Sequence, residues 1–314
     1  MTELPVVFGA ERHLVGTLTL PSGPPRSAAA FLLLNAGVVN RTGPHRINVK
    51  LARQLAAAGY ASLRFDLSGQ GDSRVSSSTG SFSEQNVADI RAAMDHVGRT
   101  VDLHRFAIAG ICSGADNGWA TAQVDERVVG LFMVDGFTFP TPRTRWVRLR
   151  LRARGPILSA VGPWLRRRLT AWTRRGPADA PVEYGRWTPT REHYAQVTQA
   201  LVDRGVRLCL LFSGSLLPQY NHESQFRDAF AGHDFAARVR TEYQPLIDHT
   251  VTPLDAQRRL IGLVLDWAAS LDAGQEVMAA APAGAAVTAG APAVADIAGA
   301  TTAPAGTERD GPRP

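Results

Sequence analysis

The sequence predicts an α/β protein built on a mostly parallel sheet with helices on both faces. Continuous apolar runs, such as 28–34 and 128–134, alternate with segments whose apolar residues recur at helical spacing. Strands buried on both faces have such unbroken apolar runs because neither face meets water. A third run, 106–109, ends in the turn-like segment Gly110-Ile-Cys112-Ser-Gly114, and a helix-compatible stretch follows it.

The individual elements can be assigned from apolar spacing, capping residues and glycine stops. We expect strands at 3–8, 12–20, 28–34, 60–65, 106–109, 128–134, 206–212 and 237–243, the first two as an antiparallel pair. We expect helices at 47–58, 81–97, 113–123, 192–203 and 223–230, and a last one that begins near 252–255.

Composition divides the chain into a core with one insertion and a tail. Eleven arginines and no acidic residue lie between 143 and 175, interleaved with Trp and Leu, and Pro and Gly break this stretch into short helices. We therefore expect a first core part at 1–137, an arginine-rich helical lid at 138–190 and a second core part at 191–272. The Ala/Gly/Pro-rich tail, 273–314, lacks large apolar groups, and we expect it to be disordered.

The totals restrict the class of protein. With 314 residues and a net charge of +6, the composition is that of a soluble globular protein. No apolar run is long enough to span a bilayer, and no signal peptide opens the chain. Two cysteines are too few for a disulfide framework, and no His/Cys spacing indicates zinc. We expect a cytoplasmic protein without a cofactor.

The turn after 106–109 has the pattern Gly-x-nucleophile-x-Gly, in which the central residue stands at the tip of a strained strand-to-helix turn. Side chains two residues to either side of the tip collide with the neighbouring backbone, and glycine avoids this collision. This register puts Cys112 at the tip. Putting Ser113 there would place Ile111 and Ala115 at the crowded positions, so Cys112 is the predicted tip residue.

These features together resemble the α/β-hydrolase superfamily over about residues 3–270, interrupted by a lid-like insertion. The segment Asp66-x-x-Gly69-x-Gly71-Asp72-Ser73 is similar to one in the lipase/aminopeptidase-like branch. The loop Asn35-Ala-Gly37 through Gly43-Pro44-His-Arg46 resembles that of bacterial hydrolases encoded beside polysaccharide or secondary-metabolite pathways.

The resemblance implies roles for particular residues. Cys112 would be the nucleophile, aided by its place at a helix N-terminus, and His249 before the last helix would be the base. The oxyanion would be bound by the backbone N–H of Ser113 and by that of Gly37, with Val38 as the alternative in the same loop.

The acid of the triad departs from the family pattern. An Asp normally follows the strand that here ends at Phe212, but the sequence there is Ser-Gly-Ser-Leu-Leu-Pro-Gln-Tyr-Asn-His-Glu. Asp135, at the end of the preceding strand, Glu223 and Asn221 remain the alternatives, with Asp135 ranked slightly first. A thiolate–imidazolium pair can persist without this partner, so its absence from the usual place does not exclude catalysis.

Four further residues are candidates for substrate contact. Asn35 stands where relatives often carry histidine, and it would brace the loop by hydrogen bonding. Val38 belongs to the same loop. His45 and Arg46, beside the expected mouth of the site, would bind an anionic substrate group.

The sequence thus predicts an ester or, preferably, thioester hydrolase that works through a cysteine acyl-enzyme. Two alternatives remain open: an acyltransferase using the same intermediate, and a non-catalytic binding protein with the same fold. The arginine-rich lid is compatible with two interpretations. Its arginines form a solvated face, or they bind an acidic partner, namely an acyl carrier protein, the phosphates of coenzyme A or an anionic membrane surface. No nucleic-acid-binding motif accompanies the charge.

Overall fold

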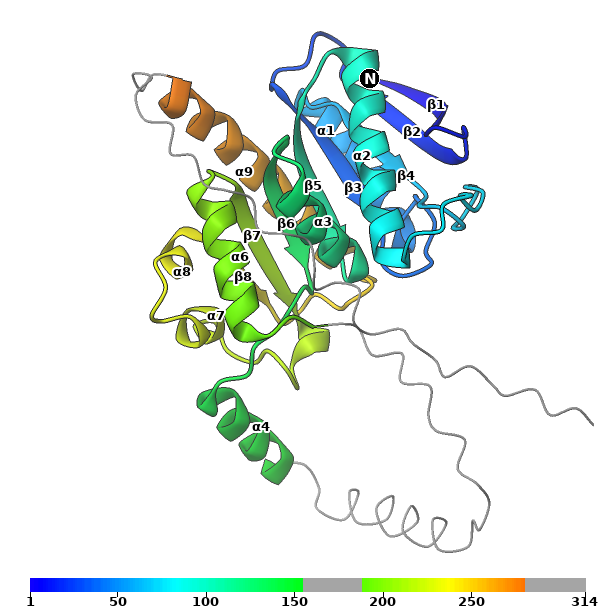
Figure 1. Ribbon diagram of the computed structural model, residues 1–314. Coiled ribbons are helices and arrows are strands. Elements are labelled where there is room, and N and C mark those ends of the chain that lie inside the picture. Colours follow the sequence, from blue (N-terminus) through cyan, green and yellow to red (C-terminus); the bar gives the residue numbers. More distant parts are fainter. Residues whose placement is uncertain (155–187, 280–314) are drawn as a thin grey trace, which may run out of the picture.

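An eight-stranded sheet forms the centre of the molecule (Figure 1), which we describe from a computed structural model covering residues 1–154 and 188–279. The strands are β1 (Thr2–Phe8), β2 (Leu14–Leu20), β3 (Ala29–Leu34), β4 (Ser62–Phe65), β5 (Arg105–Ile111), β6 (Val128–Val134), β7 (Arg207–Ser213) and β8 (Arg240–Gln244). Their order is β1-β2-β4-β3-β5-β6-β7-β8. The β1–β2 and β2–β4 pairs are antiparallel and all other neighbours are parallel, which confirms the prediction of a mostly parallel sheet.

Helices cover both faces of this sheet (Figure 1). The described helices are α1 (Ile47–Ala57), α2 (Phe82–Val101), α3 (Ser113–Val124), α4 (Pro142–Arg154), α6 (Arg191–Asp203), α7 (Gln225–Ala229), α8 (Phe235–Arg238) and α9 (Leu254–Ala279). Of these, α4 lies away from the sheet (Figure 1). Two 3-10 turns, Pro44–Arg46 and Gly214–Leu216, follow β3 and β7.

The core consists of two apolar clusters, one on each face of the sheet. Alternate residues of β3 point to opposite faces, so Phe31 belongs to one cluster and Leu32 to the other. On the first face Phe31 meets Trp267 of α9 edge to face. On the second face Trp119 of α3 stacks on Tyr194 of α6. Full burial of each such large side chain stabilises the fold by about 1.5–3 kcal/mol.

The helix α2 begins with the predicted capping box. The Ser81 hydroxyl accepts the N–H of Glu84, and the Glu84 carboxylate accepts the N–H of Ser81. The helix runs on to Val101, four residues beyond the predicted end, and stops where Asp102 adopts a left-handed conformation (φ 53°).

Near the end of the described chain, two more boundaries differ from the sequence prediction. The last strand begins at Arg240 rather than at 237, because Phe235–Arg238 form the short helix α8, whose Phe235 is buried against Phe230. The last helix runs to Ala279, past the predicted start of the tail at 273. Residues 273–279 include Ala, Gln, Glu and Met, which are strong helix formers, and this composition favours continuation of the helix. The remainder of the tail, 280–314, lies outside the described residues.

Candidate active site

The parallel strands β5, β6 and β7 bring three chain segments to one edge of the sheet. Ile111 is in register with Val134, and Val134 with Leu211. The residues that follow the first two strands, Cys112 and Asp135, therefore emerge beside each other. Carboxyl ends of parallel strands are where α/β folds place their sites.

Cys112 forms the tip of a sharp turn between β5 and α3. Its backbone dihedrals (φ 54°, ψ −117°) lie in a region that a cysteine rarely adopts, whereas Ser113 is already the first residue of the helix. A Cβ on Gly110 would lie 2.4 Å from Gly114, and one on Gly114 would lie 2.7 Å from the carbonyl oxygen of Asn35. Both glycines are therefore required by backbone crowding, and Cys112, not Ser113, occupies the turn.

His249 reaches this turn from the loop between β8 and α9. Its Nδ1 lies 2.7 Å from Oδ2 of Asp135, and its ring also hydrogen-bonds Cys112. Its backbone N–H donates to Oγ of Ser215 at 2.8 Å, which holds the loop in place. The bond to Asp135 and, next, the bond to Cys112 raise the pKa of His249 to about 10, against the opposing effect of desolvation.

Asp135 is fully buried and carries positive φ (53°). Its carboxylate accepts the N–H of Ser213 at 2.8 Å and the hydroxyl of Ser213 at 2.7 Å, besides its contact with His249. Hydrogen bonds of this kind are what a buried carboxylate requires. A single carboxylate thus orients the histidine while the end of β7 orients the carboxylate.

Sequence reasoning did not identify Ser213 and Ser215, although both are part of this network. Ser213 Oγ also accepts the N–H of Ser215, whose own hydroxyl holds the His249 backbone. A signal was present: Ser213-Gly-Ser215 stands at the carboxyl end of β7, where the resemblance led us to expect an acid. Hydroxyls at that position complement a carboxylate supplied by the neighbouring strand.

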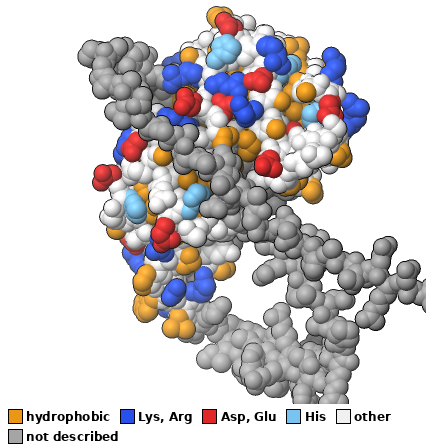
Figure 2. Space-filling model, viewed as in Figure 1, with side chains coloured by type: hydrophobic (Ala, Val, Ile, Leu, Met, Phe, Trp, Pro, Cys, Tyr) orange, Lys and Arg blue, Asp and Glu red, His pale blue; other side chains and the backbone are white. Residues whose placement is uncertain are grey.

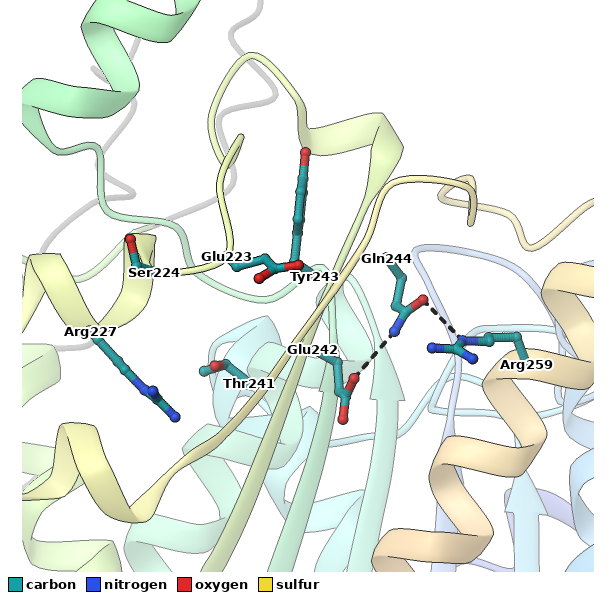
Figure 3. Close-up of a pocket in the computed structure, with 8 residues that line it drawn as sticks. All are labelled: Glu223, Ser224, Arg227, Thr241, Glu242, Tyr243, Gln244 and Arg259. Carbon is teal, nitrogen blue, oxygen red and sulfur yellow. Dashed lines mark hydrogen bonds between the residues drawn. The ribbon is translucent and has the colours of Figure 1, made fainter.

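The other two candidates for the acid are not brought to His249. Glu223 lines a separate polar pocket with Tyr243 and Arg259 (Figure 3). The Nδ2 of Asn221 donates to the backbone carbonyl of Thr144, 3.1 Å away. After the turn Gly214–Leu216 the chain leaves the strand ends, so both residues lie on a segment that packs near α4 and α7.

The loop after β3 carries the expected second oxyanion donor, but the amide is already engaged. The N–H of Gly37 donates to Oγ of Ser113 at 2.7 Å. Val38 is 85% exposed and packs into no core, and the N–H of Val39 closes a turn onto Ala36. The backbone N–H of Ser113 belongs to the first turn of α3, where helix amides have no partner within the helix.

The remaining candidates for substrate contact separate into buried and exposed residues. Asn35 is buried, and its Oδ1 accepts from Nδ2 of Asn48 at 2.5 Å, a contact that braces the loop instead of facing solvent. His45 and Arg46 are exposed. Nε2 of His45 lies 3.2 Å from Oγ1 of Thr252, so this loop meets the loop that carries His249.

The segment 66–73 plays a structural part. Asp66 is buried and accepts hydrogen bonds from the Arg41 backbone and guanidinium and, at 3.1 Å, from the N–H of Asp72. A Cβ on Gly71 would lie 2.5 Å from the Asp66 carboxylate. The glycine pattern in this segment therefore serves a tight turn around one buried carboxylate.

Helix α4 is the described part of the predicted lid. Arg143 donates to Oγ of Ser224 at 3.2 Å, and Arg148 donates to the carbonyl of Pro218. On the face shown in Figure 2, basic and hydrophobic side chains lie side by side at this end of the molecule. Trp146 of α4 is exposed. The rest of the lid prediction, 155–187, falls outside the described residues.

Neither a metal centre nor a membrane span is found in the part of the chain that the structure describes. Within 1–154 and 188–279, no group of three or more His, Cys, Asp or Glu side chains is arranged to hold a metal ion. No helix in those ranges is both long and apolar enough to cross a bilayer.

Comparison with known proteins identifies the fold. No family model and no curated protein matches the sequence. Among solved structures, the chain is similar to a proline iminopeptidase from Mycobacterium smegmatis, with 17% identity, 87% of this chain and 100% of that chain covered, and a TM-score of 0.54.

Two further structures give a TM-score of 0.50. An alpha-beta serine hydrolase homologue from Coxiella burnetii has 14% identity and covers 84% of this chain and 96% of its own. The epoxide hydrolase VrEH1 from Vigna radiata has 13% identity and covers 86% of this chain and 98% of its own. At identities this low, the structural similarity establishes a shared backbone arrangement and nothing beyond it. The strand order agrees with that arrangement. This chain has the α/β-hydrolase fold.

Proposed function

We propose that this protein is a hydrolase of esters or thioesters that works through an acyl-enzyme on Cys112. The observation that carries the proposal is the single chain of contacts from the buried Asp135 through His249 to Cys112, with Cys112 at the tip of the strained turn. A nucleophile bonded to a base that a third group orients is the arrangement that covalent catalysis requires.

The electrostatics favour an ion pair in the resting site. A His249 pKa of about 10 keeps the imidazole protonated at neutral pH, and the positive charge lies against the cysteine sulfur. Such a charge, together with the N-terminus of α3, favours the thiolate. A serine hydroxyl at this position would gain little, because it needs a neutral histidine to take its proton.

The reaction follows from these charges. The Cys112 thiolate attacks the carbonyl carbon, and the resulting oxyanion is held by amide donors of the elbow. As the intermediate collapses, the His249 imidazolium gives its proton to the departing alcohol or thiol and an acyl-thioester remains on Cys112. The neutral imidazole then takes a proton from water as that water attacks the acyl-thioester. Collapse of this second intermediate releases the carboxylic acid and the Cys112 thiolate, and His249 keeps the proton, which restores the ion pair.

Thioesters are the preferred substrates within this class. The acyl-enzyme is itself a thioester, so acyl exchange with a thioester substrate is nearly thermoneutral. An alcohol or amine in place of water gives transfer instead of hydrolysis. The arginines of α4 support an anionic handle on the substrate, such as a phosphate-bearing carrier.

The non-catalytic alternative rested on the missing acid after β7. The contact of Asp135, the residue after β6, with His249 supports the catalytic proposal over that alternative.

The test is intact mass spectrometry after incubation with short and long acyl thioesters of N-acetylcysteamine, beside the matching p-nitrophenyl esters. We expect a transient acyl adduct on wild type, none on Cys112→Ala, and slow formation and decay of the adduct on His249→Ala. Added alcohol that diverts the acyl group would favour transfer over hydrolysis. No adduct and no turnover with any substrate would contradict the proposal and favour a binding protein.

A further inference from the structure

The side chain of Ser113 makes a hydrogen bond in the site that the role of its backbone N–H does not explain. Its Oγ accepts the N–H of Gly37 at 2.7 Å. Ser113 follows Cys112 directly and is half-buried at the start of α3. Its hydroxyl is therefore fixed between the elbow and the loop after β3, the two segments that line an oxyanion site in this arrangement.

The bond from Gly37 uses one lone pair of the hydroxyl and leaves the O–H proton without an assigned acceptor. Within the described ranges, the Ser113 hydroxyl makes no other hydrogen bond. A hydroxyl can accept one bond and donate another at once. Its proton is thus available to a ligand in the site.

The Gly37 amide, by contrast, is not free to bind an oxyanion directly while it bonds Ser113. Among the described residues, no atom lies within 4 Å of the position that a Cβ on Gly37 would take. From these contacts we infer that the Ser113 hydroxyl is itself a catalytic oxyanion donor, bonding the developing negative charge alongside the Ser113 backbone N–H, while Gly37 orients and polarises it.

The physical gain comes from a chain of aligned dipoles. A hydroxyl that already accepts a hydrogen bond becomes a stronger donor, and donation to an ionised oxygen is stronger than donation to a neutral carbonyl. The interaction therefore strengthens as the carbonyl becomes a tetrahedral oxyanion, which is the condition for lowering the barrier instead of merely binding substrate. No proton is transferred in this step.

The inference rests on the proposed acyl-enzyme chemistry, so its test must separate the two. Ser113→Ala removes the hydroxyl, and Ser113→Thr keeps it. Four quantities are measured for each variant: kcat, KM, the affinity for an acyl aldehyde, and the rate of Cys112 alkylation by iodoacetamide. The aldehyde adds to Cys112 as a hemithioacetal whose oxygen occupies the oxyanion position, whereas alkylation forms no oxyanion.

For Ser113→Ala we expect kcat to fall about 10- to 100-fold with KM nearly unchanged, which is at or below the effect of deleting one oxyanion donor elsewhere. Aldehyde affinity should fall by a similar factor and alkylation should stay at the wild-type rate. Ser113→Thr should retain most of the activity.

Three outcomes would overturn the inference. An unchanged kcat would mean that the hydroxyl is idle, and an increased kcat would mean that it blocks the site. An alkylation rate that falls as much as kcat would assign the hydroxyl a structural role at the elbow. If the wild-type protein itself forms no adduct on Cys112, the proposed function fails first, and the inference that depends on it fails too.

Discussion

Oδ2 of Asp135 lies 2.7 Å from Nδ1 of His249, although the two residues are 114 positions apart in the chain. The carboxylate comes from the end of β6, and the imidazole from the loop after β8. Between these strands, β7 supplies Ser213, whose N–H and hydroxyl both bond the same carboxylate. In the family pattern the acid follows β7. Here the end of β7 instead bonds a carboxylate that follows the neighbouring strand, β6.

Replacing Asp135 should therefore impair turnover, whereas replacing Glu223 should not. Asp135→Asn keeps the shape but removes the charge that stabilises the His249 imidazolium, so we expect kcat to fall by about 100-fold or more, by analogy with loss of the orienting acid in other triads. Steady-state kinetics with an acyl thioester measure the effect. Glu223→Gln is the matched control because Glu223 lies in the separate pocket of Figure 3. A larger loss in Glu223→Gln than in Asp135→Asn would reverse the assignment.

Alkylation of the cysteine should depend on His249 and on pH. Because the pKa of His249 is raised to about 10, its positive charge persists through neutral pH and favours the thiolate. Wild type should react with iodoacetamide at a lower pH than His249→Ala does, and its catalytic turnover should decline above about pH 10 as the imidazolium loses its proton. Mass spectrometry of labelled Cys112 over pH 5–11 measures the first effect. Identical pH profiles for the two proteins would show that no ion pair exists.

The same group should make the stability of the fold depend on pH in one direction. The pKa of His249 is about 10 in the folded protein and near its ordinary value of 6.5 when unfolded. Protonation of His249 therefore stabilises the folded state fully below about pH 6.5, and this contribution is lost as pH rises towards 10.

Urea unfolding of wild type and His249→Gln at a series of pH values measures this contribution. The difference in unfolding free energy between the two proteins should shrink from pH 6.5 to pH 10. A difference that is constant over that range would contradict the prediction.

Alanine at the second elbow glycine, Gly114, should damage the site, while alanine at Gly262 in α9 should not. A Cβ on Gly114 would meet the Asn35 carbonyl oxygen at 2.7 Å, which forces the elbow and the loop after β3 apart. We expect Gly114→Ala to lose turnover and to lower the melting temperature. Gly262→Ala is the control: it lies inside α9 with nothing within 4 Å of its Cβ, and it should stabilise the protein by about 0.5–1 kcal/mol. Wild-type turnover in Gly114→Ala would contradict the prediction, because it would show that the loop after β3 can move to accommodate the methyl group without loss of activity.

The layers of the fold and the position of the elbow can be read from the order of residues alone. Unbroken apolar runs marked the buried strands because both faces of a parallel sheet exclude water, and the residues of β3 divide between the two core clusters accordingly. Gly110 and Gly114 identified Cys112 because backbone crowding at the elbow is a local property, readable from neighbours in the chain.

The partners of the site were decided only by tertiary structure. From the sequence, Asp135 ranked only slightly ahead of Glu223 and Asn221 as a candidate for the acid. The pairing of β6 with β7 brings Asp135 to His249 and to Ser213. The bond between Gly37 and the Ser113 side chain likewise joins residues 76 positions apart. Such contacts depend on which strands are neighbours and on the positions of the loop ends to within a few tenths of an ångström. Hydrophobic periodicity along the sequence gives information on neither the strand order nor these positions.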